Sequence, residues 1–215
     1  MNVELRIIRL IEKQIKIFIV PSVTRISRRR NPFQVLVSCI LSLRTKDKTT
    51  IEASLRLFKA ADNLYRMARL PKKRIQALIY PVGFYRTKAK TISDISKRII
   101  SEFRGRVPDT IDGLLSFKGV GRKTANLVLG LGYNIPAICV DTHVHRIANR
   151  LGWVRTILPS ETEEGLMKII PKREWINLNT TLVTFGQNLC LPVSPFCSKC
   201  SVAKFCKREG VLNRR

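Results

Sequence analysis

Four of the six cysteines lie within seventeen residues near the C-terminal end of the sequence. They are Cys190, Cys197, Cys200 and Cys206, with six, two and five residues between neighbours. Four thiolates so close in sequence can bind one compact centre, either a [4Fe-4S] cluster or a structural zinc ion. Zinc sites more often combine two Cys-x-x-Cys pairs, whereas this segment has one, so the spacing favours iron-sulfur. A disulfide pair or four unrelated buried thiols is the simplest alternative.

A second candidate site is the turn Lys118-Gly119-Val120-Gly121, which lies between two short apolar segments of helical character. Glycine permits positive φ and a close backbone approach, so the N–H groups of the turn and of the following helix could hold a phosphate together. Val120 is expected to pack into the core. An ordinary connection between two helices would use the same glycines and remains an alternative.

Lys123 is expected in the first turn of the helix that follows this hairpin, directly after Arg122. The positive end of the helix dipole and the neighbouring cation both disfavour its protonated form. A neutral amine is a nucleophile that attacks electrophilic carbons and forms Schiff bases, and the sugar of a nucleic acid offers such a carbon. The alternative is that Lys123 contacts phosphate only as a positive charge.

The charge balance of the chain favours a nucleic-acid partner. Its 215 residues include 40 Lys and Arg against 15 Asp and Glu, a formal net charge of +25, while hydrophobic residues make up 45%. The latter fraction is typical of a folded protein and not of a disordered basic tail. Because the cations are spread along the whole length, a merely solvated basic surface is the alternative reading of the same numbers.

The apolar N-terminal stretch, residues 3–20, could be mistaken for a signal peptide or membrane span. Charged residues interrupt it repeatedly, so it predicts an amphipathic helix. The sequence contains no run of about 18 uncharged apolar residues and no recognisable presequence. We therefore expect no membrane association and a soluble, cytoplasmic protein whose thiols stay reduced.

Apolar residues recur at helical spacing through most of the chain, and no segment alternates with period two. The clearest stripes are Phe33, Leu36, Val37, Ile40 and Leu41, then Ile92, Ile95, Ile99 and Phe103, then Val144, Ile147, Ala148 and Leu151, then Trp175, Leu178, Leu182, Phe185 and Leu189. Ser160 and Glu163 indicate a capping box, and Pro171 ends that helix. The sequence predicts an all-α fold of roughly ten helices.

Three motifs together resemble the endonuclease III branch of the helix-hairpin-helix DNA glycosylases. They are FKGVGRKTAN at 117–126, VDTH at 140–143, and the cysteine ladder, with an acid 18 residues after the lysine. The resemblance covers nearly the whole chain. It implies a six-helix barrel domain with the hairpin, residues 25–135, and an iron-sulfur cluster domain formed by residues 1–24 and 136–215, with a [4Fe-4S] cluster on the four cysteines.

The resemblance also implies a mechanism. Lys123 attacks C1′ of a damaged nucleotide flipped out of the duplex, and Asp141 assists through its charge and by proton transfer. The Schiff base then permits β-elimination, which nicks the strand 3′ to the lesion. The implied enzyme is a base excision repair glycosylase and lyase for oxidised pyrimidines, a nucleoid-associated monomer that binds double-stranded DNA with damaged bases or abasic sites. A helix N-cap is the simpler role for Asp141, and both roles are expected.

The DNA-contacting residues that the resemblance implies are Ser42, Arg44, Asp47, Phe84, Gly119, Val120, Gly121, Arg122 and His143. Arg44 stands where the family often has Gln, and Phe84 where it usually has an aliphatic wedge. Either side chain could fill the gap left by a flipped base, while a phosphate contact for Arg44 and a core position for Phe84 are the alternatives. The spacing of His143 and His145 does not indicate a metal site.

Several other functions fit parts of this pattern. Adenine and thymine mismatch glycosylases share the cysteine ladder but usually lack an amine at the position of Lys123. An iron-sulfur DNA-binding or redox-sensing module without enzymatic activity would not need Lys123 together with Asp141. Two cysteines outside the ladder, Cys39 and Cys139, lie in apolar runs and are expected in the core.

Overall fold

The structure is a computed structural model, which describes residues 2–27 and 30–215. All regular elements in these residues are helical, so the predicted all-α fold is confirmed. The described residues form twelve α-helices, more than the ten expected, because short helices of five or six residues carry little apolar periodicity. The chain divides into two compact units, one of Ser22–Ile135 and one of Met1–Pro21 with Pro136–Arg215.

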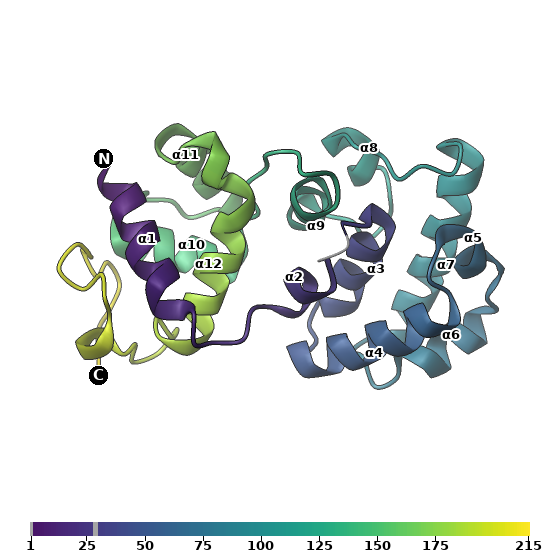
Figure 1. Cartoon of the computed structure of the whole chain (residues 1–215), viewed down its shortest axis with the longest axis horizontal. Coiled ribbons are helices and arrows are strands. Elements are labelled where there is room, and N and C mark those ends of the chain that lie inside the picture. The colour runs from purple at the N-terminus through teal and green to yellow at the C-terminus, as the bar shows by residue number, and fades with distance from the viewer. Residues whose placement is uncertain (1, 28–29) are drawn as a thin grey trace. The chain divides into compact units, whose positions relative to one another are not determined.

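The first unit is built around a helix that is apolar on all sides. Its helices are α2 (Ser22–Ile26), α3 (Pro32–Ser42), α4 (Asp47–Ala60), α5 (Leu64–Arg69), α6 (Lys72–Ile79), α7 (Tyr85–Glu102), α8 (Ile111–Leu115) and α9 (Arg122–Leu127), which continues as a π-helical turn over Val128–Gly132. In α3, residues 35–41 are each at most 2% exposed. Such a helix belongs in a core, and α2, α4, α7 and α9 pack around it (Figure 1).

The long helix α7 carries a buried stripe and an exposed face. Ala89, Ile92, Ile95 and Ile99 are buried along it, and α5 and α6 pack against this helix. It begins directly after Phe84, whose backbone is left-handed with φ +57°. The start of α7 is therefore a sharp turn that presents Phe84 just outside the helix.

The second unit joins the N-terminal helix to the C-terminal part of the chain. Its helices are α1 (Val3–Ile15), α10 (Thr142–Leu151), α11 (Pro159–Ile169) and α12 (Trp175–Asn188), with 3-10 turns at Lys172–Glu174 and Cys197–Lys199. Ile7, Ile8 and Ile11 are buried where α1 packs against α12 (Figure 1). The amphipathic helix predicted over residues 3–20 is therefore confirmed for Val3–Ile15, and residues 16–20 are not helical. Within the described residues, none of the helices combines the length and apolarity that crossing a membrane requires.

The capping box predicted at Ser160 and Glu163 is wrong. Helix α11 begins at Pro159, and the Glu161 carboxylate accepts hydrogen bonds of 3.0 Å from the backbone N–H groups of Ile157 and Leu158. Proline favours the first helical position because its φ is already helical and it has no N–H to leave unpaired. The helix therefore starts earlier than the Ser160 signal suggested.

Candidate functional site

Helices α8 and α9 form a hairpin around a turn at residues 118–121. Gly119 has φ +88°, which side-chain-bearing residues rarely adopt, and an added Cβ would lie 3.4 Å from Thr91 Cγ2. Val120 is 6% exposed and packs into the core, as the sequence predicts. Gly121 has an ordinary φ of −99°, and a Cβ added there would meet no atom within 4 Å. The turn thus leaves open space beside the first N–H groups of α9.

Lys123 is the second residue of α9, so the prediction that it lies in the first turn of this helix is confirmed. It is exposed, while the next two residues, Thr124 and Ala125, are buried. Helix α3 packs against α9, and Lys123 lies close enough to Cys39 for its charge to act on the pKa of the thiol. Burial raises the pKa of the Cys39 thiol to about 12, and the positive charge of Lys123 acts against that rise. An amine therefore lies at the surface beside the hairpin turn.

Asp141 is the N-cap of α10. One carboxylate oxygen accepts hydrogen bonds of 2.9 Å from the backbone N–H groups of both His143 and Val144, which confirms the predicted cap. The residue is half-buried and belongs to the unit of Pro136–Arg215, whereas Lys123 belongs to the unit of Ser22–Ile135. The cap fixes the direction of this carboxylate relative to α10.

Arg44 and Phe84, the two candidate wedge residues, lie together. The guanidinium carbon of Arg44 is 5.8 Å from the centre of the Phe84 ring, within cation–π range. Phe84 is 64% exposed, so its alternative placement in the core is wrong. Both residues have left-handed backbones, with φ of +51° for Arg44 and +57° for Phe84. Two turns from different parts of the sequence therefore present one stacked pair at the surface.

The stacked pair and the hairpin turn line the same open cavity of about 380 Å³, a size in the range of ligand pockets. Its lining residues are Ile40, Leu43, Arg44, Phe84, Thr87, Lys88, Thr91 and Gly119. They come from the end of α3, from the start of α7 and from the turn between α8 and α9. The fold thus gathers three of the sequence motifs of this unit around one cavity.

Lys88 in this cavity is a site residue that sequence reasoning missed. It is 7% exposed, and burial lowers the pKa of its amine to about 8. The signal in the sequence is its place on the apolar face of α7, four residues before Ile92. A lysine on such a face is buried only where polar groups meet its amine.

The other candidate residues bond within the protein. The Ser42 hydroxyl donates to the Cys39 carbonyl at 2.8 Å, and the Asp47 carboxylate accepts from Ser22 at 2.6 Å, which links α4 to α2. His143 Nδ1 lies 3.2 Å from the Arg146 guanidinium in the second unit. Ser42 and Asp47 therefore hold the two ends of the loop that carries Arg44.

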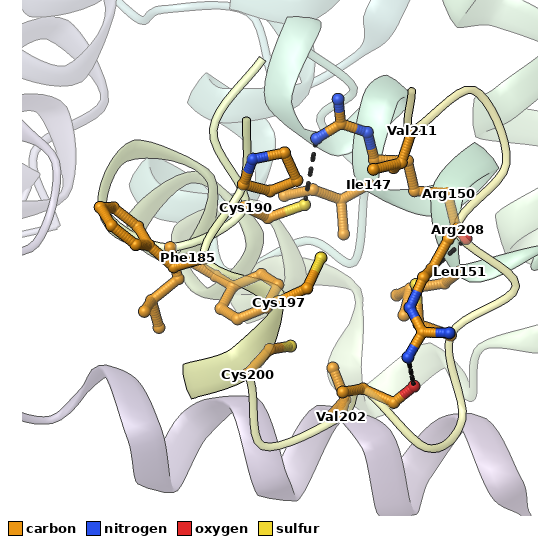
Figure 2. Close-up of a pocket in the computed structure, with 15 residues that line it drawn as sticks. Ile147, Arg150, Leu151, Phe185, Cys190, Cys197, Cys200, Val202, Arg208 and Val211 are labelled. Atoms are coloured by element: carbon orange, nitrogen blue, oxygen red, sulfur yellow. Dashed lines mark hydrogen bonds between the residues drawn. The ribbon is translucent and has the colours of Figure 1, made fainter. Parts of the chain in front are cut away.

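The four ladder cysteines line a small cavity of about 30 Å³ in the second unit. Each is half-buried, and the walls are otherwise largely apolar, with Ile147, Leu151 and Phe185 among them. Figure 2 shows the sulfur atoms of Cys190, Cys197 and Cys200 facing the same space. No two of the six cysteines form a disulfide, all six being in described segments, so the disulfide alternative is wrong.

Arg150, on α10, fixes the loop after the first ladder cysteine. It is 7% exposed and donates to the carbonyls of Leu191 and Pro192 at 2.6 Å each, and to Cys190 Sγ at 3.5 Å (Figure 2). The Cys206 thiol in turn donates to the Arg150 carbonyl at 3.2 Å. Arg150 therefore places a positive charge beside the sulfur of the first ladder cysteine.

Burial favours the protonated form of two of the ladder thiols. It raises the pKa of Cys200 to about 11 and also raises the pKa of Cys206. Metal binding to these thiols would release protons, because thiolate is the ligand form. In the described part of the chain, no three His, Cys, Asp or Glu side chains converge as the ligands of a single metal ion would.

Comparisons with known proteins agree with this arrangement of motifs. Residues 37–172 match the model of the HhH-GPD superfamily of base excision DNA repair proteins. The chain is 44% identical over 189 residues to Endonuclease III of Thermotoga maritima, covering 88% of this chain and 89% of that protein. It is 38% identical to Endonuclease III of Bacillus subtilis, covering 84% and 82%.

A solved structure shares the fold. The structure of a trapped covalent intermediate of Endonuclease III with DNA, an estranged-adenine complex, superimposes with a TM-score of 0.77 at 36% identity. The match covers 83% of this chain and 84% of that one. This chain thus shares its helical fold with a protein whose structure was solved in covalent complex with DNA.

Proposed function

Because the chain belongs to the endonuclease III family of helix-hairpin-helix base excision DNA repair proteins, we propose that it removes oxidised pyrimidines from duplex DNA and nicks the strand through a lysine Schiff base. The enzyme class is that of a DNA N-glycosylase with AP lyase activity. The observation that carries the proposal is the exposed Lys123 in the first turn of α9, directly behind the Gly119–Gly121 turn. A binding module would not need an amine there.

Lys123 is the proposed nucleophile, acting on a nucleotide flipped out of the stack. Its amine forms a bond to C1′ while the N-glycosidic bond breaks, and the base leaves with that electron pair and takes up a proton. Opening of the sugar ring at the C1′–O4′ bond gives the Schiff base. Loss of a C2′ proton then expels the 3′ phosphate by β-elimination, and water hydrolyses the imine to free the lysine.

Asp141 is the proposed acid–base and electrostatic partner. C1′ gains positive charge as the glycosidic bond stretches, so a carboxylate placed near it stabilises that charge and can accept a proton from the attacking amine. The two backbone hydrogen bonds at the start of α10 support this role, because they orient the carboxylate without neutralising it. The mismatch glycosylases, which usually lack the amine, are less well supported than a lyase.

Cys190, Cys197, Cys200 and Cys206 are the proposed ligands of a [4Fe-4S] cluster, with zinc as the alternative. The donor set fits, since four thiols line one cavity with apolar walls and a buried guanidinium beside one sulfur. Bound there, the cluster would cross-link the C-terminal segment to the end of α12 and so hold the shape of this unit. Arg150 and the carbonyls that it binds keep the first ligand loop in place.

The proposed partner is double-stranded DNA that contains damaged bases or abasic sites, bound by a nucleoid-associated monomer in the cytoplasm. The backbone of Gly119, Val120 and Gly121 would meet phosphate, with Arg122 and His143 adding side-chain contacts. Arg44, on a loop whose ends Ser42 and Asp47 hold, and Phe84, in the turn before α7, would enter the base stack. The net charge of +25 supports binding to the phosphate backbone.

Borohydride trapping tests the proposal. The wild-type protein should form a covalent complex with duplex DNA that carries an abasic site or thymine glycol, and Lys123→Gln should bind the DNA without forming it. Lys118→Gln, which removes the exposed lysine of the same turn, should still be trapped. Strand cleavage that persists in Lys123→Gln would refute the Schiff-base assignment.

A further inference from the structure

The buried lysine of the first unit connects the two turns that carry the wedge residues. The Lys88 amine donates hydrogen bonds to the carbonyls of Leu41 at 2.9 Å and Leu43 at 2.5 Å, and to Thr45 Oγ1 at 3.1 Å. An ammonium group has three protons to donate, so these three acceptors use all of them. Two of the acceptors, Leu43 and Thr45, are the residues on either side of Arg44.

The backbone of the same lysine is tied to the other wedge residue. Its N–H donates to the Phe84 carbonyl at 3.0 Å in the first turn of α7. One residue therefore bonds to Phe84 through its main chain and to both neighbours of Arg44 through its side chain.

The two turns also pack directly on each other. A Cβ added to Gly83 would lie 2.8 Å from the Arg44 carbonyl oxygen, so only glycine fits between them. The left-handed backbones of Arg44 and Phe84 are unfavourable for residues with side chains, and such conformations persist only where the surroundings hold them. The hydrogen bonds from Lys88 and the contact at Gly83 are the interactions that hold them here.

We propose that Lys88 is a positioning residue for the wedge, a proposal that rests on the function proposed above. It holds Arg44 and Phe84 in their strained turns, so that the stacked pair enters DNA as one preformed unit in place of the flipped base. A loop that had to find this conformation after binding would lower the population of the flipped state. Lys88 itself touches neither the sugar nor the base.

The test compares two duplexes that differ only in their need for a wedge. In the first, thymine glycol is paired with adenine; in the second, it faces a tetrahydrofuran residue, which has no base to leave unpaired. Under single-turnover conditions, Lys88→Met should slow base release from the first duplex about tenfold, the effect of losing one held backbone conformation. On the second duplex its rate should stay within about threefold of wild type.

Three controls make each outcome decisive. Lys90→Met removes an exposed lysine from the same helix and should match wild type on both duplexes. Thr45→Val removes only the hydroxyl that accepts a hydrogen bond from Lys88. If Lys88→Met does not fold, the rates of Thr45→Val on the two duplexes test the role of Lys88 instead. Wild-type protein that cleaves neither duplex would contradict the proposed function before any variant is compared. Equal loss on both duplexes, or no loss on the first, would overturn the role of Lys88.

Discussion

The amine of Lys88 lies 2.5 Å from the carbonyl oxygen of Leu43, in a site that leaves the lysine 7% exposed. Burial lowers the pKa of this amine from 10.5 to about 8. The folded protein therefore binds this proton less tightly than the unfolded chain does. It follows that the buried charge lowers stability at neutral pH, and that this penalty disappears as the pH rises from about 8 to about 10.5.

Lys88→Met should reveal that pH dependence. The free energy of unfolding of wild type, minus that of the variant, should increase by roughly 1–3 kcal/mol between pH 8 and pH 10. Urea unfolding at several pH values measures it, with Lys90→Met as the matched loss of an exposed charge. A difference that is flat or that falls over this range would show that the amine is not buried as a cation.

The two glycines of the hairpin should respond differently to alanine. Gly119→Ala places a side chain at φ +88° and should lower the free energy of unfolding by about 1 kcal/mol or more. Gly121→Ala meets open space at an ordinary φ and should change stability by less than about 0.5 kcal/mol. Its added methyl group should nevertheless weaken DNA binding about tenfold, because phosphate must approach the backbone there.

Urea unfolding and fluorescence anisotropy at fixed salt separate these two effects. The anisotropy titration would use a duplex with a tetrahydrofuran abasic analogue, and salt is held constant because phosphate contacts depend on it. If Gly121→Ala binds this duplex as tightly as wild type, the turn does not hold phosphate.

Asp141→Asn should separate the two roles of this residue. Asparagine caps helices about as well as aspartate, so stability should change by less than about 0.5 kcal/mol. The loss of negative charge should slow base release by roughly 10²- to 10⁴-fold, the usual range for a general acid–base group. Asp141→Ala, which also loses the cap, should in addition lower stability by about 1 kcal/mol. If Asp141→Asn released the base at the wild-type rate in single-turnover assays, Asp141 would act only as a helix cap and not in catalysis.

The cysteine cavity should hold iron. Anaerobically purified protein is expected to contain about four iron atoms per chain and to absorb broadly in the visible range. Cys197→Ser should lower the iron content, whereas Cys139→Ala, at a buried cysteine outside the cavity, should not. One zinc ion per chain with no iron would contradict the cluster assignment.

Strong local patterns made most of the fold predictable. The apolar stripes at 33–41 and 175–189 correspond to α3 and α12, because a helix that must bury a face repeats its apolar residues every three or four positions. The turn around Gly119 and the cap at Asp141 were predictable since each depends on backbone geometry that few residue types satisfy. The cysteine ladder was visible from spacing alone.

Features that depend on contacts distant in sequence were not predictable. The stacking of Arg44 on Phe84 and the bonds from Lys88 to both sides of Arg44 join segments about forty residues apart, and no local pattern encodes that approach. The start of α11 differs from the prediction because a proline at its first position outweighs a serine one residue later. The one sign of Lys88 in the sequence is that a lysine stands among the apolar residues of one helical face.

The identity of the trapped lysine tests the central claim most directly. Wild-type protein would be treated with borohydride on duplex DNA that contains an abasic site, the complex digested with nuclease and protease, and the modified peptide sequenced by mass spectrometry. A reduced sugar remnant is expected on the amine of Lys123. A remnant on Lys118 or on any other amine, or efficient strand cleavage without a trapped complex, would contradict it.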